Sequence, residues 1–365
     1  MKKITLFYDG SWYTFKWIKS MLWAKNEFRE LGYIVSFINE EEYIPAQNKT
    51  EIFERDLLNH EYDIVLLAHH DSHIGLCSIE YSKFEYLMKR LKERCNKIVW
   101  CDTSDSTGTL WSKAFPFVDL YFKKQTLLDL NKYTNRMWAG RLYTQYYLDK
   151  GYINEEGADY DPPVTESDLK KIRLSWNVGL GELFESKEVS YQKPHHIFTP
   201  DSIAPSLDRK YDIQYKGTLD YSVCGYQRLR STELIGKSSL KHSDIFSIIP
   251  YKDYLKEIAE SKSVVSPYGW GEICTRDFEA FLQGSVLIKP DMSHMTTYPN
   301  WYIKNQTYVP IKWDFSDFMD VIEQAKNSKE YIKIAQNAQD LFNYHRNTKM
   351  GKREFAEHIV HELER

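Results

Sequence analysis

The sequence predicts an α/β protein made of two Rossmann-like, doubly wound domains that face each other across a cleft. The chain has 365 residues, enough for two domains that each bury a core. In both halves, short apolar runs alternate with stretches of helical periodicity, a pattern typical of parallel sheets covered by helices. Between residues 152 and 210 the alternation stops and proline-containing turns accumulate, which indicates a connection between domains.

Strands in the first half are expected wherever an apolar run ends in a turn or a polar loop. They are Ile4–Tyr8, Tyr33–Ile38, Tyr62–Ala68 and Lys97–Cys101. The third run, YDIVLLA, has the apolar continuity of a strand buried on both faces of a parallel sheet. Helices are expected at Trp12–Leu31 and Ile79–Arg94, where apolar residues recur at helical spacing.

The second half repeats this pattern. Its expected strands are Tyr211–Tyr215, Asp244–Ile249, Ser263–Ser266 and Ser285–Lys289, and its expected helices are Tyr251–Lys262 and Arg276–Gln283. We therefore place a first domain at residues 1–160, a connection at 161–210, a second domain at 211–328, and C-terminal helices at 329–365. These last helices could pack back on the first domain. The connection contains an apolar stretch, 172–183, that should pack against a domain.

Composition limits the partners and the compartment. The net charge of -4 gives no electrostatic reason to expect a nucleic-acid partner. The five cysteines have no CxxC spacing and suggest free thiols, and no apolar stretch approaches the ~20 residues of a membrane span. We therefore expect a cytoplasmic protein. The aromatic content of 15% suits surfaces that receive sugars or lipid head groups, although aromatic residues are equally common in cores.

The segment after the strand at Ser263 has features of an anion site. Gly269 and Gly271 precede a helix, so backbone amides and the positive helix end could bind a diphosphate. Arg276 in the first helical turn could pair with phosphate, and Glu279, one turn later on the same face, could accept bonds from ribose hydroxyls. Alternatively, the two glycines form only a tight turn, and Arg276 and Glu279 form an ordinary i,i+3 pair on the helix surface.

Residues 264–291, VVSPYGWGEICTRDFEAFLQGSVLIKPD, resemble the C-terminal half of GT-B glycosyltransferases, including the group 1 and exostosin-like families. The resemblance rests on Gly271, Glu272, Arg276, Glu279, Ala280, Gly284 and Pro290. It implies that Glu279 contacts the ribose of a nucleotide-sugar donor, and that the glycine turn and Arg276 hold its diphosphate. Retaining group 1 enzymes usually have seven residues between their two glutamates, whereas Glu272 and Glu279 have six between them.

A second glycine turn, Lys216-Gly217, follows the strand at Tyr211, where GT-B proteins commonly have a turn below the donor phosphates. Arg228 or Arg230 on the following helix could reach the same charge, or could be solvated surface residues. The expected donor-binding residues are Lys216, Gly217, Arg228, Tyr268, Gly271, Glu272, Arg276 and Glu279.

An inverting transfer needs a general base near the acceptor hydroxyl, whereas a retaining one does not. The first choices are His70 and Asp71, and the second is Asp105; Asp9, His69 and Asp102 also follow expected strands of the first domain. Each of these residues could instead cap a loop or be solvated.

Several motifs are set aside. His69, His70 and His73 resemble a metal cluster, but neighbouring strand residues point to opposite faces and a fourth ligand is not evident. The D-x-D at Asp159 and Asp161 lies in a proline-rich connection. GxGxxG, GxxxxGK[ST] and GxSxG are absent from the sequence. We expect no cofactor and no metal, with a nucleotide sugar as the donor substrate.

The resemblance predicts a glycosyltransferase that moves a sugar to a hydroxyl of a glycan or lipid-linked glycan in cell-surface polysaccharide synthesis. Such an enzyme could associate peripherally with the inner face of the membrane. Two alternatives remain: a phage-type glucosyltransferase acting on modified DNA bases, and a noncatalytic module that binds a nucleotide or a glycan.

Overall fold

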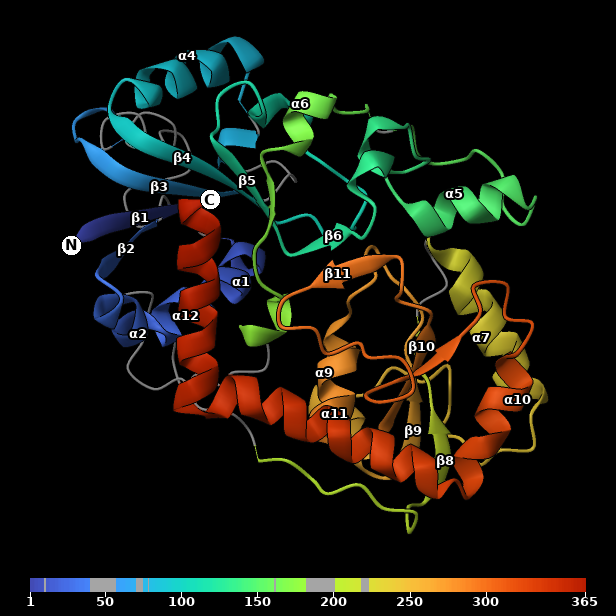
Figure 1. The fold of residues 1–365 in the computed structure, drawn as a ribbon. Coiled ribbons are helices and arrows are strands. Elements are labelled where there is room, and N and C mark those ends of the chain that lie inside the picture. Colours follow the sequence, from blue (N-terminus) through green and yellow to red (C-terminus); the bar gives the residue numbers. More distant parts are fainter. Residues whose placement is uncertain are drawn as a thin grey trace.

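The structure is a computed structural model. It describes residues 1–9, 11–39, 57–69, 75–77, 79–160, 162–181, 201–217 and 223–365. The chain forms two lobes, each with a parallel sheet at its centre (Figure 1). The prediction of two Rossmann-like α/β domains is therefore confirmed.

The first domain is built on a six-stranded parallel sheet in the order β2-β1-β3-β4-β5-β7. The strands are β1 Lys2–Tyr8, β2 Tyr33–Asn39, β3 Tyr62–His69, β4 Cys95–Asp102, β5 Leu120–Lys123 and β7 Ile172–Leu174. This is the order of flavodoxin-like sheets, in which ligands bind beyond the carboxyl ends of the strands.

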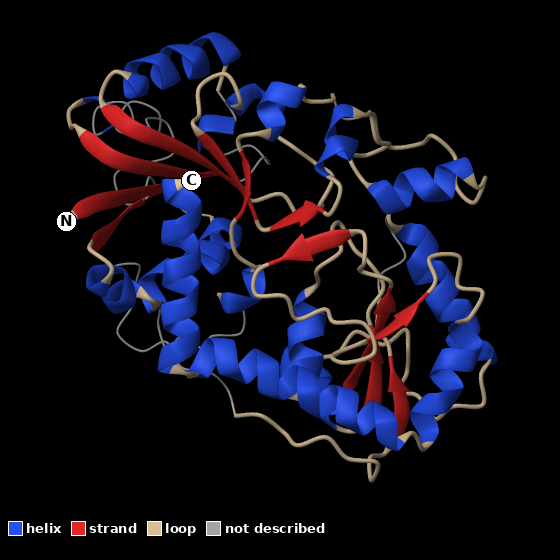
Figure 2. Cartoon of the chain, viewed as in Figure 1, coloured by secondary structure: helices blue, strands red, loops and turns tan. Residues whose placement is uncertain are grey.

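Helices cover both faces of this sheet (Figure 2). Alternate residues of β1, β3 and β4 pack with α1 (Trp12–Trp23), α2 (Lys25–Glu30) and the C-terminal helix on one face. The intervening residues pack with α4 (Tyr81–Lys92) on the other. The expected helix 12–31 is thus two helices, interrupted at Ala24.

The second domain has a four-stranded parallel sheet in the order β12-β10-β9-β8. Its strands are β8 Tyr211–Gln214, β9 Ser261–Val265, β10 Val286–Pro290 and β12 Val309–Ile311. One face packs against α8 (Tyr251–Ala259), α9 (Thr275–Leu282) and α11 (Lys329–Asn347). The other packs against α7 (Gly225–Lys237) and α10 (Phe318–Glu323).

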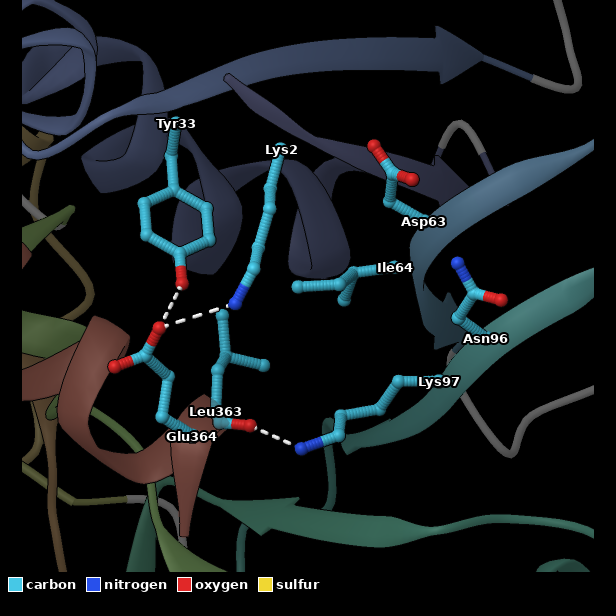
Figure 3. A pocket seen from close by; sticks show the side chains of 8 residues that line it. All are labelled: Lys2, Tyr33, Asp63, Ile64, Asn96, Lys97, Leu363 and Glu364. Atoms are coloured by element: carbon cyan, nitrogen blue, oxygen red, sulfur yellow. Dashed lines mark hydrogen bonds and ion pairs between the residues drawn. The ribbon is translucent and has the colours of Figure 1, made fainter.

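The last helix, α12 (Lys349–Glu364), leaves the second domain and lies on the first (Figure 1). Phe355 packs against Phe28 and Trp176, with ring centroids 5.9 Å and 5.8 Å apart. At its end, Glu364 accepts hydrogen bonds from Lys2 and Tyr33 beside a pocket of ≈ 410 Å³ (Figure 3). This pocket lies at the amino ends of the strands, opposite to the edge where ligands bind. We therefore assign these contacts to the anchoring of α12 and not to a ligand site.

A short antiparallel ribbon joins the domains. It pairs β6 (Gln125–Leu127) of the first domain with β11 (Met295–Thr297) of the second.

The remaining helices are α5 (Leu142–Asp149) and α6 (Glu166–Leu169), and the 3₁₀ turns are 75–77, 112–114, 130–134, 178–180 and 324–326. No helix among the described residues is long and apolar enough to cross a bilayer.

Two further sequence-based assignments differ from the structure. The first domain extends beyond residue 160, because β7 pairs with β5 and Trp176 stacks on Trp17 at 4.4 Å. The strand expected at Asp244–Ile249 is an irregular loop. Two of its apolar side chains face solvent: Phe246 is 72% exposed and Ile248 is 100% exposed.

Candidate active site

The glycine turn at 267–272 lies at the carboxyl end of β9 and is held from both domains. Within it, the Gly269 amide donates to the Gly271 carbonyl at 2.9 Å. From α7 of the same domain, Gln227 Oε1 accepts from the Tyr268 amide at 2.7 Å. The Tyr268 side chain is fully buried, so its predicted donor contact could come only through the backbone of the turn.

Helix α9 begins directly after this turn and presents its amino end there. Asp277 in its first turn is buried and pairs with Lys289 at 3.1 Å, both side chains being 0% exposed. Ser266 and Tyr302 also donate to the Asp277 carboxylate. These bonds fix the start of α9, and the positive end of its helix dipole makes this position favourable for an anion.

Arg228 reaches the turn from α7. Its Nη2 lies 3.0 Å from where a Cβ of residue 269 would be, so glycine at this position lets the guanidinium approach the backbone. Tyr215 supports this arrangement, because its hydroxyl donates to the Arg228 carbonyl at 3.2 Å. A Cβ at Gly217 would lie 2.4 Å from the same hydroxyl, so the second predicted glycine also permits a close approach.

Lys216 and Arg276 lie beside the turn but are engaged by the protein. The Arg276 guanidinium donates to the Lys216 carbonyl and, at 3.2 Å, to the Tyr254 hydroxyl. The Lys216 ammonium points to a neighbouring loop, with Ser247 Oγ at 2.8 Å and Glu257 at 3.3 Å. Their charges therefore add positive potential at the turn, while most of their N–H groups are already hydrogen-bonded within the protein.

Glu279 lies one helical turn into α9 and is only 4% exposed. Its Oε1 accepts from the Tyr251 hydroxyl at 2.9 Å, and Tyr251 itself is 56% exposed. Burial and the nearby Glu279 raise the pKa of Tyr254 to about 12, although Arg276 opposes the shift. Glu279 is thus a buried acceptor covered by an exposed side chain that a ligand hydroxyl could replace.

Asp105 comes to the same turn from the first domain. Its carbonyl oxygen would lie 1.9 Å from a Cβ on Gly271, so the two backbones are in direct contact. The carboxylate is 59% exposed and pairs with Lys124 at 3.3 Å. Of the predicted acceptor-side residues that the structure describes, Asp105 is the one that it brings to the glycine turn.

Glu272 connects the domains. It is fully buried, and its Oε2 accepts from the Thr107 amide of the first domain at 2.9 Å, while His294 Nε2 lies 3.4 Å from Oε1. Burial opposes ionisation, yet the bonds from His294 and Thr107 hold the pKa of Glu272 below its ordinary value. This geometry favours a role in joining the domains over direct contact with a donor.

The other first-domain candidates are placed differently. His70 and Asp71 lie outside the described residues, as do His73 and Asp161 of the motifs set aside. His69 is 2% exposed and packs against Trp100, with ring centroids 6.0 Å apart. Asp102 is buried in an ion pair with Lys123 at 2.9 Å, and this pair supports the loop that carries Asp105.

Sequence analysis missed the contribution of α5. Tyr143 donates to the Gly269 carbonyl at 2.8 Å, and Tyr147 donates to the Trp313 carbonyl at 2.8 Å. Just before α5, Arg141 donates to the Trp270 carbonyl at 2.8 Å and lies over its ring. The spacing of Tyr143, Tyr146 and Tyr147 defines one helical face, which was the available signal.

Two Rossmann-like domains whose carboxyl edges meet, with the C-terminal helix returning to the first domain, form the GT-B architecture. No protein-family model and no curated protein sequence matches the chain. Solved structures with similar folds include a glycosyltransferase from Rickettsia africae ESF-5, at 11% identity, covering 99% of each chain, with a TM-score of 0.46.

Two further similar structures contain UDP. An alpha-glucosyltransferase with UDP and a 13-mer DNA containing a HMU base shares 9% identity, covering 98% of this chain and 99% of that chain, at a TM-score of 0.46. S. aureus MnaA with UDP shares 9% identity, covering 100% of this chain and 97% of that chain, at a TM-score of 0.42. Identities and TM-scores this low assign no reaction to this chain.

Proposed function

We propose that this chain is a glycosyltransferase that uses a nucleotide-sugar donor. The observation that carries the proposal is the convergence of Arg228 and the amino end of α9 on one glycine turn, which Asp105 reaches from the other domain. Glu279 lies one helical turn further along α9. This is an anion site beside a buried acceptor of hydroxyl bonds, with a carboxylate opposite. A nucleoside diphosphate sugar has the matching groups.

In this proposal the diphosphate lies at the amino end of α9, where turn amides and Arg228 meet its charge. Arg276 adds positive potential and keeps the Lys216-Gly217 turn in place. The ribose hydroxyls donate to Glu279 and displace the Tyr251 hydroxyl that occupies it. The nucleotide base is left to experiment.

The reaction joins an acceptor hydroxyl oxygen to the anomeric carbon, while the bond from that carbon to the diphosphate breaks. The leaving diphosphate gains negative charge, which the helix end and Arg228 stabilise, so the proposal needs no metal. If configuration inverts, Asp105 is the carboxylate that we propose to take the acceptor proton, with His70 and Asp71 as alternative bases.

We further propose that the acceptor is a hydroxyl of a glycan or lipid-linked glycan at the cytoplasmic face of a membrane. The half-exposed aromatic residues at the domain boundary support a sugar-binding surface, since rings with polar edges suit sugars.

Turnover tests the proposal. Wild-type protein is incubated with UDP, GDP, ADP, CMP and dTDP sugars, with and without mixed oligosaccharide acceptors, and free nucleotide is quantified. We expect one nucleotide class to be consumed, faster with acceptor. Binding of a nucleotide sugar without any release of free nucleotide would instead identify a noncatalytic binding module.

A further inference from the structure

Aromatic rings from both domains gather where α5 meets α7 and the loop after β12. Tyr152 of the first domain stacks on Tyr226 of the second, with centroids 5.1 Å apart and planes at 9°. Tyr146 meets Trp313 edge to face at 5.5 Å. Tyr147 lies between the two pairs, 4.5 Å from Tyr226 and 5.5 Å from Tyr146. We call Tyr146, Tyr152, Tyr226 and Trp313 the aromatic platform.

The platform is rigid at its centre and accessible at its rim. Tyr147 is buried, donates to the Trp313 carbonyl at 2.8 Å and accepts from Gln227 at 2.7 Å. Tyr152, by contrast, is 43% exposed. Within the described part of the chain, the hydroxyls of the three platform tyrosines make no hydrogen bond to protein.

The charges around the platform suit a neutral polyhydroxyl ligand. Asp314, next to Trp313, accepts from the Ser316 amide at 2.9 Å and is half-buried. Burial and then Asp314 raise the pKa of Tyr146. The Lys150 ammonium lies 5.9 Å from the Tyr146 ring. Burial raises the pKa of Tyr226 and Arg230 opposes the shift, so charges of both signs border the rings. Asp314 can accept hydrogen bonds from sugar hydroxyls, and this mixed charge suits a neutral ligand.

The platform lies close to the glycine turn because α5 touches both. Tyr143 donates to the Gly269 carbonyl at 2.8 Å, and Tyr146 follows it by three residues in the same helix. At ~1.5 Å of rise per residue, these positions are about 5 Å apart along the helix axis. The end of the platform at Tyr146 is therefore close to the glycine turn.

We propose that the aromatic platform binds the acceptor as a neutral oligosaccharide, which stacks a pyranose ring on Tyr152 and hydrogen-bonds to Asp314. The role of the bound glycan as the acceptor rests on the proposed function, whereas glycan binding itself can be tested without a donor. It would make the acceptor a glycan and would place its recognition on residues from both domains.

The test measures binding of maltohexaose, cellohexaose, chitohexaose and a 13-mer DNA duplex to the full chain, by titration calorimetry and ligand-observed NMR. The variants are Tyr152→Ala and Asp314→Asn, and the matched control is Tyr86→Ala on α4, where the tyrosine is 50% exposed. Thermal unfolding of every variant establishes that it is folded, so a loss of glycan binding can be assigned to the aromatic platform.

We expect at least one hexasaccharide to bind wild type and Tyr86→Ala equally, and to bind Tyr152→Ala about fivefold more weakly or worse, since the ring on which the sugar stacks is removed. Equal binding by Tyr152→Ala would overturn the proposal, as would the failure of all three hexasaccharides to bind wild type. DNA binding that Tyr152→Ala weakens would also overturn it, in favour of a nucleic-acid surface. If a hexasaccharide binds through Tyr152 but no nucleotide sugar binds, the platform stands and the donor assignment fails.

Discussion

Replacing Glu272 should destabilise the contact between the domains. In Glu272→Ala the Thr107 amide loses the carboxylate that accepts its hydrogen bond at 2.9 Å, and His294 loses the same carboxylate as a neighbour. Both contacts are buried between the two domains. Leaving a buried donor without its acceptor typically costs about 1 to 3 kcal/mol. We expect a loss of unfolding free energy of this size, because the shared hydrophobic cluster leaves water little access to either group.

The assay is urea unfolding followed by tryptophan fluorescence and by circular dichroism. Glu272→Gln is the control: it keeps an oxygen for Thr107 and should cost less than the alanine variant. Because the folded pKa of Glu272 is below its ordinary value, its contribution is present above about pH 4.3 and is lost as the pH falls through the folded pKa. The difference between wild type and Glu272→Gln should therefore shrink at acid pH. An alanine variant within about 0.5 kcal/mol of wild type at neutral pH would show that Glu272 does not stabilise the contact between the domains.

Other predictions concern the turn. Gly271→Ala should lower the thermal unfolding midpoint and the activity together, because the added Cβ would lie 1.9 Å from the Asp105 carbonyl; an unchanged midpoint would contradict the close contact. Asp105→Asn should leave nucleotide affinity unchanged but reduce transfer about 100-fold or more if configuration inverts, as measured by nucleotide release in the presence of acceptor. Arg228→Ala should weaken nucleoside diphosphate binding about tenfold in calorimetry, because a charge-assisted bond is lost; equal affinity would remove Arg228 from the site.

The sequence predicted β9, the glycine turn, α9 and β10 closely because each has a local cause. β10 is a short apolar run, and β9 ends in two valines. In α9, Phe278, Phe281 and Leu282 form an apolar face at helical spacing. Gly284 at φ 64° follows the end of the helix, a position that favours glycine. The strand expected at Asp244–Ile249 is absent: Ile245 is buried, but Phe246 and Ile248 are exposed. Periodicity alone does not report what an apolar residue packs against.

The side-chain roles were harder to predict than the positions. Lys216 and Glu272 lie where the motif placed them, but the Lys216 ammonium turns to Ser247 and the Glu272 carboxylate turns to Thr107. These partners are distant in sequence, so no local pattern specifies them. The same holds for α5, whose tyrosines show a helical face but not that the face meets the second domain.

Nucleotide binding to the site at α9 should depend on Glu279. Wild type, Glu279→Ala and the surface control Glu233→Ala are titrated with UDP, GDP, ADP, CMP and dTDP in a calorimeter. Because Glu279 is a buried charged acceptor for hydroxyl groups, the account predicts that one nucleotide binds wild type and Glu233→Ala alike, and binds Glu279→Ala at least about tenfold more weakly. Equal affinity in Glu279→Ala, or no binding of any nucleotide to wild type, would contradict it.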